Sequence, residues 1–203
     1  MTEGGSVEMT DWIQAIEIFA AVTGVVYVIL EILQKNAMWW VGILSGAACA
    51  FEFVTQHVWA SMGLNIYYMG MSVLGLIQWK KASTEVGEHT IHLNMMTHRV
   101  RMISLGILVV GISVLTPILK NTGDAAPVLD GLAVTLSVIA TWWLAQSYLE
   151  QWMLWILADL LNTAICLTTG QYWMAAMYLA YIASAVYGYF HWKNHGEYVN
   201  LRD

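Results

Sequence analysis

Charged residues are scarce in this sequence. Asp, Glu, Lys and Arg make up only 11% of the 203 residues, whereas a soluble domain usually carries about 25%. Basic residues are the rarer kind, with 8 Lys and Arg against 14 Asp and Glu and a net charge of −6. We therefore expect no nucleic-acid partner, because binding to phosphates needs clustered positive charge. The shortage of charge as a whole argues against a soluble protein.

Catalytic and metal-binding patterns are also missing. Cys49 and Cys166 each lie in an apolar stretch, which predicts inert buried thiols and not a disulfide or metal pair. His89, His92 and His98 share a polar stretch and are interpreted as solvated side chains, not zinc ligands. No Gly-rich phosphate loop, nucleophile elbow or zinc-binding helix motif occurs. We therefore expect neither an enzyme nor a cofactor.

Hydrophobic and aromatic residues are abundant instead. They raise the hydrophobic fraction to 59% and include 11 Trp and 10 Tyr, and such rings favour membrane interfaces. A transmembrane helix needs roughly 20 mostly apolar residues. Seven stretches meet this need: 13–34, 37–56, 58–79, 100–119, 126–147, 151–169 and 171–192. The sequence predicts an all-α integral membrane protein with seven transmembrane helices, because helices satisfy their own backbone hydrogen bonds in lipid.

The connections divide the chain into segments. Residues 80–99 form a polar loop and 1–12 precede the first span. The expected order is an N-terminal segment (1–12), a first three-helix unit (13–79), a loop (80–99), a connector helix with its loop (100–125), a second three-helix unit (126–193) and a tail (194–203).

The direction of the chain follows from its basic residues. With seven spans, every Lys and Arg except Lys120 falls on the side opposite the N-terminus. Because basic residues concentrate on the cytoplasmic side, we expect the N-terminus outside and both the 80–99 loop and the C-terminus in the cytoplasm. The membrane is then the inner, cytoplasmic membrane.

An internal repeat relates the two ends of the chain. At an offset of 113 residues, Trp39 aligns with Trp152, and Gly75 aligns with Gly188. The same offset aligns Trp79-Lys80 with Trp192-Lys193. Spans one to three thus match spans five to seven and point the same way. Parallel repeats of this kind occur in transporters, with substrate bound near the midplane between the halves.

Polar residues inside the spans are the candidates for a binding site. Trp152, Trp155, Asp159 and Asn162 follow one another at spacings of 3, 4 and 3, which places them on one helix face. Aromatic rings attract a cation, and a carboxylate supplies its counter-charge. For Trp152 an interfacial aromatic belt is the plainer interpretation, and Glu31 and Glu150 are placed near headgroups.

Further polar stripes lie on spans three, five and seven, and span two carries a carboxylate. Interhelical hydrogen bonding without a ligand is the alternative interpretation of these stripes. The complete predicted set of substrate-binding residues is Trp155, Asp159, Asn162, Asn65, Tyr68, Ser72, Tyr178, Tyr181, Glu52, Trp142 and Gln146.

Several motifs resemble one family of carriers. E-x-W-x-x-W-I-x-x-D at 150–159, W-x-G-I-L-S at 40–45 and L-N-I-Y-Y-M-x-M-S-V-L-G-L-I-Q-W at 64–79 resemble the Pnu family of B-vitamin precursor transporters, which includes the nicotinamide riboside (PnuC) and thiamine (PnuT) types. The resemblance covers nearly the whole chain except the 80–99 loop.

The resemblance implies a 3+1+3 arrangement of parallel triple-helix repeats, like the SWEET sugar transporters. It also implies facilitated diffusion of a cationic aromatic precursor, either thiamine or nicotinamide riboside, with phosphorylation by a cytoplasmic kinase making uptake one-way. The expected partners are the lipid bilayer, the small-molecule cargo and further copies of the chain in a homo-oligomer. Asn65 stands where riboside carriers often have Gln, so both cargos stay open.

Two alternatives remain at the level of sequence. A proton-coupled carrier would use Asp159 or Glu52 to move protons. A seven-helix sensor or receptor is the alternative from another class. It would need a large signalling loop or tail, and the 80–99 loop is short.

Overall fold

A computed structural model of the chain describes the backbone of residues 22–55, 59–87 and 90–199, and the side chains of these residues except those at 48–62 and 86. Seven helices contain most of the described residues. They are Val22–Ile32, α2 (Ala37–Thr55), α3 (Trp59–Val86), α4 (His98–Asn121), α5 (Pro127–Ala145), α6 (Gln151–Thr168) and α7 (Tyr172–His195). Two short strands, β1 (Ile91–Leu93) and β2 (Gly196–Tyr198), complete the described part.

The helices follow the apolar stretches of the sequence. Among the described helices, α4, α5 and α6 are long and apolar enough to cross a membrane, and Val22–Ile32 and Ala37–Ala47 are shorter apolar helices. The bounds of α6 and α7 lie within three residues of the predicted spans. The α3 helix differs, since it continues to Val86 where the sequence predicted a loop from residue 80. Polar residues can extend a helix beyond the bilayer, so apolar length alone underestimates it.

Glycines shape the turns that follow α4 and α6. Gly123 and Gly170 have φ values of 83° and 75°, which favour glycine because it lacks a Cβ. The backbone N–H of Asp124 returns to the Leu119 carbonyl, and that of Gln171 returns to Cys166. These bonds satisfy the last carbonyls of each helix, so α5 and α7 begin close to the ends of α4 and α6.

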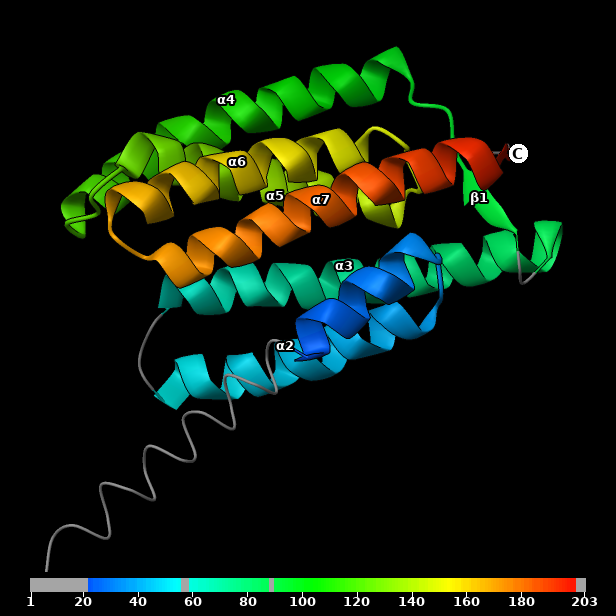
Figure 1. Ribbon diagram of the computed structural model, residues 1–203, viewed down its shortest axis with the longest axis horizontal. Coiled ribbons are helices and arrows are strands. Elements are labelled where there is room, and N and C mark those ends of the chain that lie inside the picture. Colours follow the sequence, from blue (N-terminus) through cyan, green and yellow to red (C-terminus); the bar gives the residue numbers. More distant parts are fainter. Residues whose placement is uncertain (1–21, 56–58, 88–89, 200–203) are drawn as a thin grey trace, which may run out of the picture.

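The helices run side by side along one long axis (Figure 1). The α6 helix packs against both α5 and α7, α4 packs against α5, and α2 packs against α3. Contacts between α3 and α5 join the two groups. In Figure 1 α4 lies on the outer side of α5 and α6, away from α2. The α4 helix is thus peripheral to a bundle built from the other helices.

A small sheet lies at one end of the bundle. Strands β1 and β2 pair in parallel, with Ile91 opposite Gly196 and Leu93 opposite Tyr198. The sequence predicted only an irregular loop and a tail here, in an all-α fold. Three-residue strands leave no periodic pattern, and their partner lies about 100 residues away, so the pairing is not readable locally. We refer to this as the sheet end of the bundle.

Side chains attach β1 to both groups of helices. The Gln34 amide binds the backbone of His92 at two points, donating to its carbonyl (3.0 Å) and accepting from its N–H (2.7 Å). The Asn94 side chain donates to the Gln146 carbonyl at 2.8 Å. Residues 91–94 are therefore held by the turn after the first helix and by the turn after α5.

Buried tryptophans fill the core next to the sheet. Trp39 meets Trp79 edge to face with ring centroids 4.9 Å apart, and Trp152 meets Trp192 in the same way at 5.3 Å. Trp79 and Trp192 approach one another at 6.1 Å. The Trp192 indole N–H also donates to the Ile32 carbonyl at 2.9 Å. This cluster packs the two groups of helices together at the sheet end.

Each tryptophan pair sits against a glycine. A Cβ on Gly75 would collide with the Trp39 indole, and a Cβ on Gly188 would lie 2.5 Å from Trp152. The two arrangements use residues that are 113 positions apart.

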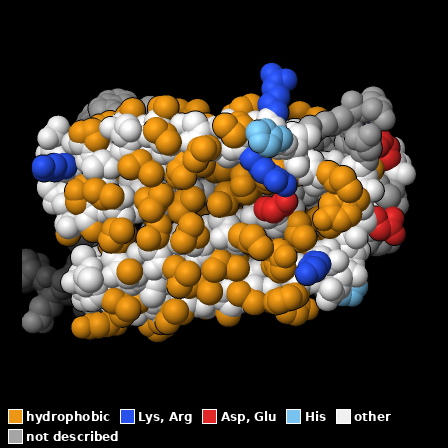
Figure 2. Space-filling view, turned by 90° about the horizontal axis from the view of Figure 1, so that it is seen from above, with side chains coloured by type: hydrophobic (Ala, Val, Ile, Leu, Met, Phe, Trp, Pro, Cys, Tyr) orange, Lys and Arg blue, Asp and Glu red, His pale blue; other side chains and the backbone are white. Residues whose placement is uncertain are grey.

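The outer surface of the bundle is apolar. Figure 2 shows the face on which α4 lies, where hydrophobic side chains dominate the middle and charged side chains gather toward the ends. Large exposed side chains on α4 include Leu105, Val109, Val110 and Val114. Such a surface is stable in contact with hydrocarbon and unfavourable in water.

Candidate functional site

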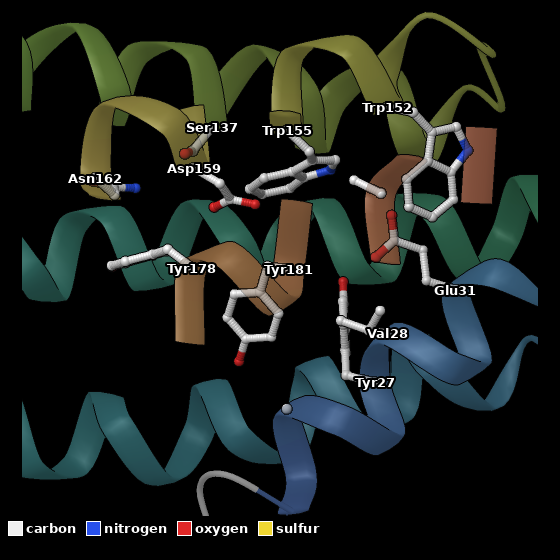
Figure 3. Close-up of a pocket in the computed structure, with 12 residues that line it drawn as sticks. Tyr27, Val28, Glu31, Ser137, Trp152, Trp155, Asp159, Asn162, Tyr178 and Tyr181 are labelled. Carbon is white, nitrogen blue, oxygen red and sulfur yellow. The ribbon is translucent and has the colours of Figure 1, made fainter. Parts of the chain in front are cut away.

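A cavity of about 340 Å³ opens between the first helix, α5, α6 and α7. Its walls are drawn in Figure 3. The lining residues are Gly24, Tyr27, Val28, Glu31, Ser137, Trp152, Trp155, Asp159, Asn162, Tyr178, Tyr181 and Ala185. The volume is at the lower end of the range for small-molecule sites.

One face of α6 supplies the polar wall of the cavity. Trp152, Trp155, Asp159 and Asn162 all line it, because their spacings of 3, 4 and 3 keep them on one side of a helix. Asp159 lies midway along α6 and is only 8% exposed. Its backbone carbonyl accepts the Thr163 hydroxyl at 2.7 Å, while its carboxylate faces the cavity.

The opposite wall comes from α7 and the first helix. Tyr178 and Tyr181 meet edge to face with centroids 6.4 Å apart, and Ala185 lies one turn further along α7. Gly24 on the first helix faces the Tyr181 hydroxyl, which would lie 2.9 Å from an added Cβ. The absence of a side chain at Gly24 thus leaves room for the Tyr181 hydroxyl.

The electrostatic character of the cavity is acidic. Glu31 and Asp159 are the acidic side chains in its lining, and no Lys, Arg or His of the described residues belongs to that lining. Glu31 is 5% exposed and accepts a hydrogen bond from the Gln151 amide at 3.4 Å. A bound cation would favour the ionised form of a carboxyl group beside it, because opposite charges interact strongly in a low-dielectric site.

Aromatic donors add to this pattern. The indole nitrogens of Trp152 and Trp155 are buried and have no hydrogen-bond partner in the described part of the chain. In Figure 3 the Trp155 ring lies between the Asp159 and Glu31 carboxylates. A bound molecule can therefore meet an aromatic ring and a carboxyl group within one cavity.

The structure does not bring all predicted residues to this cavity. Asn65 donates to the Gly46 carbonyl at 3.2 Å, and Ser72 donates to the Tyr68 carbonyl at 2.9 Å. The Asn65 contact joins α3 to α2, as the alternative interpretation expects, whereas the Ser72 contact lies within α3. Asn65, Tyr68 and Ser72 are absent from the lining. At the offset of 113 residues they correspond to Tyr178, Tyr181 and Ala185, which do line it.

The remaining predictions also lie elsewhere. Trp142 packs against the tryptophan core, and Gln146 ends α5, where its carbonyl binds Asn94. Neither belongs to the lining. The side chain of Glu52 lies outside the described residues.

Several lining residues were not predicted. Tyr27 and Glu31 occupy the end of the first span, where polar side chains ordinarily reach headgroups, and Trp152 was interpreted as part of an aromatic belt. The spacing of four between Tyr27 and Glu31 was an available signal, because it places both on one helix face.

The described residues offer no metal centre. No group of three or more His, Cys, Asp or Glu side chains within the described ranges could hold a metal ion.

Comparison with known proteins identifies the family. A family model described as "Nicotinamide mononucleotide transporter" matches residues 14–194. The chain belongs to this family. The match covers both walls of the cavity and the peripheral α4 helix.

Characterised relatives agree with this assignment. The chain is 30% identical to the nicotinamide riboside transporter PnuC of Neisseria mucosa, over 85% of this chain and 70% of that one. It is 23% identical to PnuC of Haemophilus influenzae, over 85% and 76% of the two chains. It is 21% identical to PnuC of Escherichia coli, over 90% and 85%.

A solved structure matches as well. It is described as the crystal structure of the vitamin B3 transporter PnuC, and it superimposes with a TM-score of 0.62 at 28% sequence identity. The match covers 97% of this chain and 94% of the other. The family consists of transporters and not enzymes. Family and apolar helices together make this chain a multi-pass membrane protein.

Proposed function

We propose that this chain carries nicotinamide riboside across the cytoplasmic membrane, with the cavity of α6, α7 and the first helix as its binding site. The observation that carries the proposal is the acidic, ring-lined cavity. Nicotinamide riboside joins a permanently cationic aromatic ring to a sugar with several hydroxyl groups. The names of the relatives described above include this molecule.

The residues of the cavity have complementary roles. Asp159 supplies the counter-charge, and the Trp155 ring stabilises the cationic ring by a cation–π contact, which contributes roughly 2 kcal/mol when desolvated. Asn162 and the hydroxyl groups of Tyr178 and Tyr181 are placed for hydrogen bonds to the sugar. Each of these side chains lines the cavity.

Transport would use two halves that move against each other. We propose that the helices form 3+1+3 parallel repeats, with α4 as the connector. The matched contacts of Trp39 with Gly75 and of Trp152 with Gly188 support this division. Rocking of the halves would expose the cavity to each side in turn.

The direction of uptake follows from metabolism in this proposal. The N-terminus faces outward and the sheet end faces the cytoplasm, as the distribution of Lys and Arg predicts. Flux is passive, and a cytoplasmic kinase that phosphorylates the cargo prevents its return.

Binding titrations test the cargo. Titration of the purified chain with nicotinamide riboside should change the tryptophan fluorescence, because Trp152 and Trp155 line the cavity. Asp159→Asn keeps the shape and removes the charge, so affinity should fall roughly tenfold to a hundredfold, as for a charged hydrogen bond. Glu150→Gln, outside the lining, should leave it unchanged.

Thiamine is the matched competitor, because it is also a cationic aromatic alcohol. Tighter binding of thiamine than of nicotinamide riboside would contradict the proposed cargo. Flux into proteoliposomes should be the same with and without a pH gradient. A dependence of flux on that gradient would support the proton-coupled alternative instead.

A further inference from the structure

A second hollow lies on the outer side of the bundle, between α4, α5 and α6. It is a groove of about 190 Å³. Among the described residues, none that lines this groove also lines the acidic cavity. In Figure 1 α4 runs along the outer side of α5 and α6, so the groove belongs to the apolar surface of the bundle. It is therefore a site separate from that of the cargo.

The walls of the groove are apolar. Leu105 and Leu108 come from α4, and Leu136 and Ile139 come from α5. Leu136 and Ile139 are each only 3% exposed, so they form the floor, whereas Leu105 is exposed and forms part of the rim. A hydrocarbon chain in such a groove gains dispersion contacts along its whole length.

The two uncharged polar side chains of the lining are already paired. The Trp143 indole N–H donates to the Ser104 hydroxyl at 3.0 Å, and this hydroxyl donates to the Val100 carbonyl at 2.9 Å. Neither side chain has a further hydrogen to donate. The inner part of the groove therefore favours an apolar occupant over a hydrogen-bonding one.

One cationic side chain lines the groove at its sheet end. Arg101 is exposed and belongs to the first turn of α4, which the structure describes in full and which contains no acidic residue. Leu108 follows Arg101 by two helical turns on the same face, so the groove runs about 10 Å along α4. One leaflet of the hydrocarbon core is about 15 Å deep. The groove thus has a charged mouth and an apolar channel shorter than one leaflet.

We propose that this groove binds an anionic phospholipid, with the phosphate at Arg101 and one acyl chain between α4 and α5. Guanidinium groups bind phosphate oxygens through paired N–H donors, and basic pockets between transmembrane helices are suited to anionic headgroups. A zwitterionic headgroup would bring its own positive charge close to Arg101, so charge favours the anionic lipid. With the predicted direction of the chain, this lipid belongs to the cytoplasmic leaflet.

Native mass spectrometry of the full chain in detergent tests the proposal. It measures the affinity of the first bound phosphatidylglycerol and of phosphatidylcholine with the same acyl chains. The wild-type chain should prefer phosphatidylglycerol by about fivefold, the factor for one basic contact near a membrane surface. In Arg101→Gln this preference should disappear, and the affinity for phosphatidylcholine should stay the same because the apolar walls are intact.

Matched variants separate the groove from the rest of the surface. Arg99→Gln removes the same charge from the same turn but lies outside the lining, so it should keep the preference. Leu108→Trp fills the channel and should weaken both lipids several-fold. Val110→Trp places the same ring on an exposed part of α4 outside the lining and should bind both lipids like the wild-type chain.

Four results would overturn the proposal. Equal affinity of the wild-type chain for both lipids would exclude recognition of the charge. An equal loss of preference in Arg99→Gln and Arg101→Gln would indicate diffuse attraction to a basic surface. Displacement of the lipid by glycerol 3-phosphate, which lacks acyl chains, would indicate a site for a soluble phosphate. Unchanged lipid binding in Leu108→Trp, together with an altered mass of the oligomer, would assign the groove to a second copy of the chain.

Discussion

Gly188 on α7 allows a sharp test of how the tryptophan core supports the cavity. A Cβ at this position would lie 2.5, 2.7 and 2.8 Å from ring carbons of Trp152, whereas carbon atoms prefer about 3.5–4.0 Å. Trp152 is 2% exposed and meets Trp192 at 5.3 Å, so the ring cannot turn away freely. In Gly188→Ala, α6 and α7 must therefore separate or Trp152 must leave its rotamer.

The expected magnitude comes from two opposing effects. Over-packing of a tight core costs roughly 1–3 kcal/mol, while replacing a helical Gly by Ala returns about 0.8–1.0 kcal/mol of helix propensity. Gly106→Ala on α4 measures the second effect alone, because a Cβ there meets nothing within 4 Å. The difference between these variants should be roughly 1–3 kcal/mol, or about 2–12 °C in melting temperature.

The assay combines thermal melting in detergent with ligand binding. Gly188→Ala should melt below Gly106→Ala and should also bind nicotinamide riboside more weakly, because Trp152 lines the cavity. Gly75→Ala makes the corresponding clash with Trp39, which is not a lining residue, so it should lower the melting temperature and preserve affinity. Equal melting of Gly188→Ala and Gly106→Ala would refute the steric argument. Equal loss of affinity in Gly75→Ala would refute the separate role of Trp152.

The remaining predictions concern β1. Burial lowers the pKa of His92 from 6.5 to about 4, so the unfolded chain binds the proton more tightly. Stability should fall as the pH drops from about 6.5 toward 4, by about 2 kcal/mol at pH 5. His92→Leu should reduce the shift in melting temperature between pH 7.5 and pH 5. A shift as large as that of the wild-type chain would contradict the role of His92 in this pH dependence. Gln34→Leu leaves the His92 N–H and carbonyl unpaired, so the free energy of unfolding should fall by about 2–4 kcal/mol. The control variant Gln78→Leu should have the melting temperature of the wild-type chain.

The sequence predicted the helices and one wall of the cavity because both depend on local spacing. Apolar runs of span length yield helices in lipid, and spacings of three and four align Trp155, Asp159 and Asn162 on α6. Tyr178 and Tyr181 followed from the same pattern on α7. These inferences need no knowledge of which helices are neighbours.

The rest depends on contacts that spacing cannot specify. Glu31 stands at the end of a span, where a carboxylate ordinarily reaches water, and only its approach to Gln151 shows that it is buried. Asn65 has the composition of a site residue, but its amide binds the Gly46 carbonyl. The short strands were missed for the same reason, since β1 and β2 are defined by each other.

The position of the cavity follows from a difference between two otherwise matched sets of residues. At an offset of 113 residues, Trp155 and Asp159 on α6 correspond to Gly42 and Gly46 on α2. Added Cβ atoms on those glycines would meet the side chains of Ser72 and Met69 on α3, so α2 and α3 pack closely.

At the corresponding positions of α6, the Trp155 and Asp159 side chains instead line the cavity. The matched tryptophans therefore account for similar packing at the sheet end, and the unmatched pair accounts for the cavity beside α6. We infer that charge recognition belongs mainly to α6, and that the close-packed α2 and α3 belong to the half against which α6 moves.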